Sequence, residues 1–174
     1  MSLNVEIKAR VRDLGEMRRR AAAVSDRPEE QIDQEDVFFS VPSGRLKLRL
    51  LRPDRGELIF YQRPNDPEPR KSEYFVAETS QPDGLRDVLA RAYGIRGVVR
   101  KRRLLYRVGP TRIHLDEVEG LGRFVELEVA LDGGLDETRG REIASDLMSK
   151  LGVDHRDLVA AAYIDLLDES AASR

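Results

Sequence analysis

The feature that most constrains this chain is a set of strand-like segments that alternate between apolar and charged side chains. In "RLKLRLL", residues 45–51, the leucines share one face, and Arg45, Lys47 and Arg49 share the other. Strict alternation predicts a β-strand with one apolar face, because successive side chains of a strand point to opposite sides. The same pattern predicts that the second face of this strand is almost purely basic.

Further segments carry charged faces of the same kind. The charged sets are Asn4, Glu6, Lys8 and Arg10; Lys101, Arg103 and Arg107; Arg112, His114 and Asp116; and Glu126 and Glu128. A water-facing sheet surface explains each strand taken alone, but bases gather on some strands and acids on others. A sheet of about eight strands that closes on itself points alternate side chains inward. The set therefore favours a closed barrel with a charged interior and amphipathic helices over its apolar outside.

The remaining segments supply the other parts of such a fold. The pattern predicts strands over 3–10, 31–41, 45–51, 57–63, 70–77, 97–108, 111–120 and 121–132, and helices over 13–24, 81–94, 136–152 and 155–169. Asp13 is a candidate N-cap, and Gly94 and Gly152 are candidate C-caps. We expect an α+β fold around an antiparallel barrel of about eight strands, with one domain over 1–170 and a frayed tail over 171–174.

Composition limits the classes of partner. The 30 basic residues are balanced by 32 acidic ones, and only 6% of residues are aromatic, which argues against a nucleic-acid or membrane partner. The absence of cysteine excludes thiolate metal sites, and two histidines are too few for a histidine-rich zinc site. Neither a membrane-spanning run nor a signal peptide is evident, so we expect a cytoplasmic protein. The sequence leaves a homodimer open.

The predicted interior has its own chemistry. Clustered Lys and Arg side chains donate charge-assisted hydrogen bonds to phosphate oxygens, so the cavity suits a polyanion. Carboxylates in the same cavity repel phosphate unless a cation bridges them, so Glu6, Glu126 and Glu128 are candidate ligands of Mg²⁺ or Mn²⁺. We expect the like charges of the empty cavity to repel one another.

Five ordered motifs resemble the CYTH superfamily, the triphosphate tunnel metalloenzymes. They are "NVEIKAR", "RLKLR", "VVRKRRLLYR", "TRIHLDEVEGLG" and "FVELEV". The superfamily contains class IV adenylate cyclases, thiamine triphosphatases and inorganic tri- or polyphosphatases, and its fold is a closed tunnel of antiparallel strands. Its hallmark is an N-terminal ExExK strand, in which this chain has Asn4 in place of the first Glu. The later motifs look closest to the adenylate cyclase-like branch.

The resemblance implies roles for individual residues. Matches to metal-ligand positions are Glu6, Glu126 and Glu128. Matches to triphosphate-binding positions are Lys8, Lys47, Arg49, Lys101 and Arg103, with Arg10 beside them and either Arg63 or Gln62 at a further basic position. Asp116 matches an acidic position that either holds metal or orients a basic neighbour, and we expect Lys8, Lys101 and Asp116 to act in catalysis. His114 has the inward parity of an acid or base, or of a structural hydrogen-bonding residue.

The resemblance implies three functions. The first is a class IV-type adenylate cyclase that converts ATP to cyclic AMP and pyrophosphate with Mg²⁺ or Mn²⁺. The second is a triphosphatase acting on ATP, thiamine triphosphate or inorganic triphosphate. The third is a non-catalytic polyphosphate- or nucleotide-binding module, which Asn4 keeps open because a neutral amide is a poorer metal ligand than a carboxylate.

Overall fold

The computed structural model describes residues 2–52, 54–62 and 67–172. Its strands are β1 (Ser2–Arg10), β2 (Glu30–Phe39), β3 (Arg45–Arg52), β4 (Arg55–Gln62), β5 (Arg70–Thr79), β6 (Ile95–Val108), β7 (Thr111–Val118) and β8 (Gly122–Ala130). Its helices are α1 (Leu14–Val24), α2 (Pro82–Tyr93), α3 (Glu137–Leu151), the 3₁₀-helix η1 (His155–Asp157) and α4 (Tyr163–Ala172).

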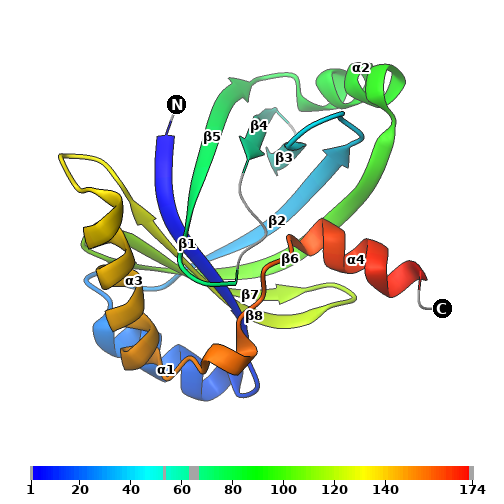
Figure 1. The fold of residues 1–174 in the computed structure, drawn as a ribbon. Coiled ribbons are helices and arrows are strands. Elements are labelled where there is room, and N and C mark those ends of the chain that lie inside the picture. Colours follow the sequence, from blue (N-terminus) through cyan, green and yellow to red (C-terminus); the bar gives the residue numbers. More distant parts are fainter. Residues whose placement is uncertain (1, 53, 63–66, 173–174) are drawn as a thin grey trace.

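The strands form one closed antiparallel barrel, as the alternating faces predict. Their order around the barrel is β1-β5-β4-β3-β2-β6-β7-β8, and β8 pairs with β1 to close the ring (Figure 1). Most neighbours in the ring are also neighbours in the chain, because short turns join antiparallel strands. Closure gives the barrel an inside and an outside.

The outer face carries the main apolar core. Ile7, Leu115 and Leu127 point outward from β1, β7 and β8 and are almost fully buried. Helices α1 and α3 lie against this face (Figure 1) and contribute Met17 and Leu147 to the same cluster. The apolar sides of these strands thus gain an apolar cover, which leaves the interior to the charged sides.

Local signals fix where the covering helices begin and end. The Asp13 carboxylate accepts a hydrogen bond from the Glu16 amide and caps α1, and Asp136 caps α3 through Arg139. Gly152 ends α3 in the left-handed conformation that favours glycine. Helix α2 covers the far side of the barrel, where its leucines pack on the outer leucines of β3 and β4.

The predicted helix over 155–169 is wrong in its first half. Only residues 155–157 form a short 3₁₀-helix, residues 158–162 are not helical, and α4 begins only at Tyr163. Leu158 bridges to Ala9, and the Val159 amide donates to the Lys8 carbonyl at 2.8 Å. β5 pairs with β1 only up to Glu6, so Leu158 and Val159 take backbone partners on β1 that β5 leaves. Helix α4 then continues to Ala172, into the predicted frayed tail.

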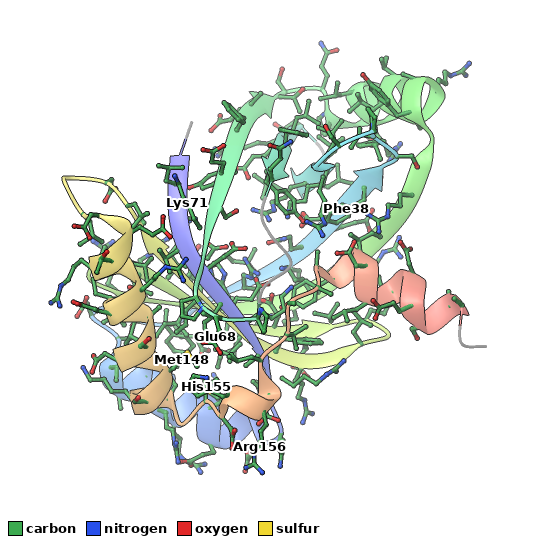
Figure 2. The ribbon with its side chains drawn as sticks, in the orientation of Figure 1. Phe38, Glu68, Lys71, Met148, His155 and Arg156 are labelled. Carbon is green, nitrogen blue, oxygen red and sulfur yellow. The ribbon has the colours of Figure 1, made fainter. Side chains whose placement is uncertain are left out.

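The start of α4 closes one end of the barrel. Its buried apolar cluster contains Phe38, Val99, Val118, Phe124, Ala162, Tyr163 and Ile164. A Cβ atom at Gly97 on β6 would lie only 2.7 Å from Ile164 Cδ1, so the helix sits directly on the wall. Figure 2 shows Phe38 beside the point where the chain enters α4. No helix in the described part of the chain is long and apolar enough to cross a membrane.

Candidate functional site

The barrel encloses a cavity of about 420 Å³. Among the described residues, seven bases and five acids line it. The bases are Lys8, Lys47, Arg49, Lys101, Arg103, Arg107 and Arg112, and the acids are Glu6, Asp36, Glu57, Glu126 and Glu128. The side chains of Arg107 and Arg112 are 42% and 38% exposed, so the cavity opens where they lie. The lining carries an excess of positive charge.

Asp116 on β7 is fully buried and is not itself among the residues that line the cavity. Its two oxygens accept a bidentate pair of hydrogen bonds from Arg103, both at 2.7 Å, and one from Lys101 at 3.0 Å. The Tyr163 hydroxyl donates to the same carboxylate at 3.0 Å. Burial alone would raise the pKa of Asp116, but the charges of Arg103 and Lys101 outweigh it and lower the pKa. This geometry makes Asp116 an orienting group for two bases.

Lys8 lines the cavity and is held by contacts with an acid, a carbonyl and an aromatic ring. Its Nζ lies 3.2 Å from Glu126 Oε1, donates to the Ala161 carbonyl at 3.1 Å and sits 3.8 Å from the centre of the Tyr163 ring. Lys101 Nζ lies 4.9 Å from the same ring centre. An aromatic face attracts ammonium groups, so the C-terminal segment contributes one ring that contacts two bases of the lining.

A second ion-pair cluster lies on β2 and β3. Asp36 is buried and accepts hydrogen bonds from Lys47 at 2.7 Å, Arg49 at 3.0 Å and Gln34 at 3.0 Å. Burial alone would raise the pKa of Asp36, but Lys47 and Arg49 outweigh it and the pKa is lowered. Burial lowers the pKa of Lys47 to about 8 although Asp36 opposes this shift. The cluster combines a permanent anion with an ammonium group that titrates near physiological pH.

A third cluster joins β7 and β8. Donor atoms of His114, Glu126 and Glu128 all lie within 4.8 Å of one another. Glu126 also contacts Arg103 at 2.9 Å, and Glu128 contacts Arg112 at 2.9 Å. Burial raises the pKa of Glu128, but His114 and Arg112 outweigh it and bring the pKa to about 2. Two ionised carboxylates beside an imidazole form a donor set that fits a divalent cation.

The comparison with known families decides what this barrel is. The sequence model of the CYTH domain family matches residues 2–163. The chain belongs to the CYTH family. The match covers all eight strands and ends at Tyr163, the first residue of α4. The resemblance of the five motifs is thereby confirmed.

Two similar proteins illustrate how far the likeness extends. The adenylate cyclase CyaB of Aeromonas hydrophila is 28% identical over 178 residues, which cover 95% of this chain and 89% of that protein. The solved structure of the PH1012 protein of Pyrococcus horikoshii is 25% identical and superposes with a TM-score of 0.81 over 94% of this chain and 98% of that one. The barrel and its helices are thus those of the CYTH fold over nearly the whole length.

The CYTH barrel brings together most of the residues that the motifs single out. Lys8, Lys47, Arg49, Lys101, Arg103, Glu6, Glu126 and Glu128 all line the cavity. Glu6 lies opposite Glu128 in the β1–β8 register, but it is outside the three-residue donor group. Its role as a metal ligand stays a prediction.

Two predicted phosphate-binding residues are placed differently. Arg10 is exposed at the end of β1, with its guanidinium 5.0 Å from the centre of the Phe124 ring, and it is not among the residues that line the cavity. Arg63 lies outside the described residues, and its neighbour Gln62 is exposed. The structure therefore gives neither Arg10 nor Gln62 a place beside the basic cluster.

The expected repulsion between like charges is present but is offset: besides burial, the charges of Arg49 and Lys101 help to lower the pKa of Lys47, yet acids lie between the bases. The inner bases are interleaved with acids, and Lys47, Lys101 and Arg103 each contact a buried carboxylate. Alternating signs across neighbouring strands stabilise the wall, since each charge lies beside its opposite. The cavity is an ion-pair network with a positive surplus, and a ligand must compete with its internal acids.

Sequence reasoning missed Asp36 and Tyr163, which both contact the bases of the site. Asp36 was hidden because Val37, Phe38 and Phe39 are all apolar, which masks the alternation that marks an inward face. Tyr163 was hidden because the run "VAAAYIDLL" has helical periodicity, and only the pairing of residues 158–159 with β1 reveals where the helix begins. Asp36 could have been found from Gln34, a polar residue two positions earlier on the same strand face. No comparable pattern pointed to Tyr163.

Proposed function

We propose that this CYTH protein is a divalent-cation-dependent enzyme that acts on a triphosphate bound in the cavity. The observation that supports this most is that Lys8, Lys47, Arg49, Lys101 and Arg103 line one cavity of the barrel together with Glu126 and Glu128. Such bases donate to phosphate oxygens, while Glu126 and Glu128 would hold Mg²⁺ or Mn²⁺. A bound cation neutralises charge on the phosphates and thereby favours displacement at phosphorus.

The cyclase reaction is the first candidate, and the name of the Aeromonas relative supports it. In this reaction the ribose 3′-oxygen forms a bond to the α-phosphorus, the bond from that phosphorus to the bridging oxygen breaks, and pyrophosphate leaves. The hydroxyl proton is released. We assign Lys8 and Lys101 to the charge that develops on the phosphate oxygens, and Asp116 to the orientation of Lys101 and Arg103.

The lining also favours a triphosphate with an organic group. Ile59, Tyr61, Tyr74 and Val76 form an apolar side of the same cavity on β4 and β5. Ligand pockets typically combine an apolar wall with a few placed polar groups. A nucleoside or a thiamine moiety fits such a wall better than inorganic triphosphate does.

Hydrolysis of a triphosphate is the second candidate. The phosphate-binding bases support it equally, because water attacking the terminal phosphate needs the same charge neutralisation as cyclisation. A third reading is a binding module without turnover. Asn4 supports it, since this buried residue gives the cavity an amide where the family's motif has a carboxylate.

Product analysis separates these candidates. The purified protein is incubated with ATP, thiamine triphosphate or inorganic triphosphate, each with Mg²⁺ and with Mn²⁺. Cyclic AMP and pyrophosphate in equal amounts would support the cyclase, and free phosphate would support the hydrolase. Tight binding without any product would support the module. Arg102→Ala, on the exposed outer face of β6, is the control for a change of basic charge outside the cavity.

A further inference from the structure

His114 carries an unexplained buried nitrogen. It points inward from β7 and is 4% exposed. Within the described part of the chain, its Nδ1 has no hydrogen-bond partner. Its nearest acidic atoms are Glu126 Oε2 and Glu128 Oε1, both at 3.9 Å, which is beyond hydrogen-bonding distance.

A buried polar atom without a partner is costly, by roughly 1–3 kcal/mol. Native proteins retain such atoms where an ion or another group satisfies them. Nδ1 and the two carboxylates lie close enough together to bind one cation. Neighbouring ligands of an octahedral cation lie on the order of 3 Å apart and opposite ones on the order of 4 Å apart. Donors separated by 3.9 Å reach that geometry through small side-chain movements.

We infer that His114 is a nitrogen ligand of the divalent cation, together with Glu126 and Glu128, and that this mixed site prefers Mn²⁺ to Mg²⁺. The inference rests on the proposed function only in that the cavity binds a divalent cation. Both ions take carboxylate oxygens, but Mn²⁺ is a first-row transition ion that also accepts an imidazole nitrogen, whereas Mg²⁺ is harder and keeps oxygen ligands and water. Carboxylates alone accept both Mg²⁺ and Mn²⁺, so a nitrogen ligand shifts the selectivity of the site toward Mn²⁺.

The sequence supports this arrangement from strand β1, which pairs with β8 beside the donor group. Asn4 replaces the first Glu of the family's N-terminal motif, so the lining loses one anionic oxygen there. Asn4 Oδ1 is also buried and has no hydrogen-bond partner within the described residues. A neutral imidazole beside Glu126 and Glu128 supplies a further ligand without another negative charge close to the phosphates.

Electron spin-echo spectroscopy of bound Mn²⁺ tests the inference directly, because it detects imidazole nitrogen coordinated to the ion. The chain has only two histidines, so the assignment is simple. Wild-type protein should show the nitrogen coupling, and protein labelled with ¹⁵N-histidine should show the corresponding isotope change. His155 is exposed outside the barrel (Figure 2), so His155→Asn should retain the coupling and serves as the matched control.

His114→Asn exchanges the nitrogen for an amide oxygen. We expect the coupling to vanish, Mn²⁺ affinity in calorimetry to fall by about tenfold or more, and Mg²⁺ affinity to change much less. Mn²⁺ that binds without nitrogen coupling, or with coupling that survives His114→Asn, would overturn the inference and leave the carboxylate site intact. Failure of the wild type to bind Mn²⁺ would overturn both the inference and the metal dependence of the proposed function. The isotope-labelled wild type gives the answer even if His114→Asn does not fold.

Discussion

At the scale of single residues, the interior of the barrel depends on pairs of buried opposite charges. Asp116 is the clearest case, because it is fully buried and accepts from Arg103, Lys101 and Tyr163. A buried ion pair adds little net stability compared with apolar residues of similar volume, but removing one partner leaves the other charge buried and unpaired. Single substitutions in this network should therefore cost much more than the same changes at the surface.

Asp116→Asn tests this asymmetry. We expect it to lower the free energy of unfolding by about 3–5 kcal/mol, because Arg103 and Lys101 lose their shared anion. Urea unfolding at neutral pH measures the change. Asp33→Asn is the control, since Asp33 pairs with Arg102 on the outer surface and its side chain is 76% exposed, and it should change stability by less than about 0.5 kcal/mol. Equal effects of the two substitutions would contradict the role of Asp116.

Lys47 gives triphosphate binding a pH dependence. Burial lowers the pKa of Lys47 to about 8, against about 10.4 for an ordinary lysine. The positive charge is therefore present below pH 8 and is lost as the pH rises through that value. We expect triphosphate affinity to weaken by about tenfold between pH 7 and 9, since one charge-assisted contact is lost.

Lys47→Arg is the control for that pH dependence, because arginine keeps its charge over this range. Calorimetric titrations with inorganic triphosphate at pH 7, 8 and 9 measure both proteins. The variant should lose most of the decline that the wild type shows. The same decline in both proteins would assign it to the ligand or to another group.

At the scale of elements, the sequence predicted the strands well, because side chains in a strand alternate with a period of two. The parity of "RLKLRLL" put Lys47 and Arg49 on one face, and the charged faces of the other strands indicated that this face points into a barrel, where the structure has it. The non-helical segment over 158–162 was not predictable in this way. Its three consecutive alanines favour a helix, whereas the structure pairs Leu158 and Val159 with β1 through long-range backbone contacts.

The charged faces therefore predicted the site only in part. They indicated which face of each strand points into the barrel, but not which acid pairs with which base. Those pairings depend on the register and the stagger between strands, as for Asp116 with Arg103 across β6 and β7. Tyr163 belongs to no strand, so no alternation pointed to it.

Glycines in two helices test how closely α3 lies on the barrel. A Cβ atom at Gly140 would lie 2.7 Å from Leu131 Cδ2 and 3.0 Å from Val5 Cγ2, whereas one at Gly84 in α2 meets nothing within 4 Å. Gly84→Ala should stabilise the protein by about 0.5–1 kcal/mol through helix propensity. Gly140→Ala should destabilise it by about 1–3 kcal/mol through overpacking. Thermal melting compares the two, and a stabilising Gly140→Ala would show that α3 can move away from β1.

At the scale of the whole molecule, the cavity has one closed end and one open end. Helix α4 covers the closed end with Tyr163 and Ile164, and Arg107 and Arg112 mark the open end. All eight strands contribute to the wall, so a ligand that bridges the charged clusters ties distant parts of the chain together. Ligand binding should therefore stabilise the native state as a whole.

Lys101→Ala tests this coupling by thermal melting with inorganic triphosphate. At a ligand concentration of about 100 times Kd, the wild type should gain about 2.7 kcal/mol. Lys101→Ala should weaken binding by about 1.5–3 kcal/mol, and it should also melt at a lower temperature without ligand because Asp116 loses a donor.

Arg102→Ala is the matched control for the preceding experiment, since Arg102 adjoins Lys101 in the chain but points outward and is exposed. It should keep the wild-type melting temperature and the full response to triphosphate. A triphosphate response in Lys101→Ala as large as in the control would remove Lys101 from the binding site.

Chloride and other singly charged anions gain little from entering a cavity whose bases already hold carboxylates. Such an ion would have to draw Lys47 and Arg49 away from Asp36, or Arg103 away from Asp116 and Glu126, and it has one charge to offer in return. A chain of three phosphates reaches several of these bases at once and outweighs the acids together. Because the ion pairs must be separated before an anion binds, we expect the cavity to bind singly charged anions weakly and ligands with several linked charges much more tightly.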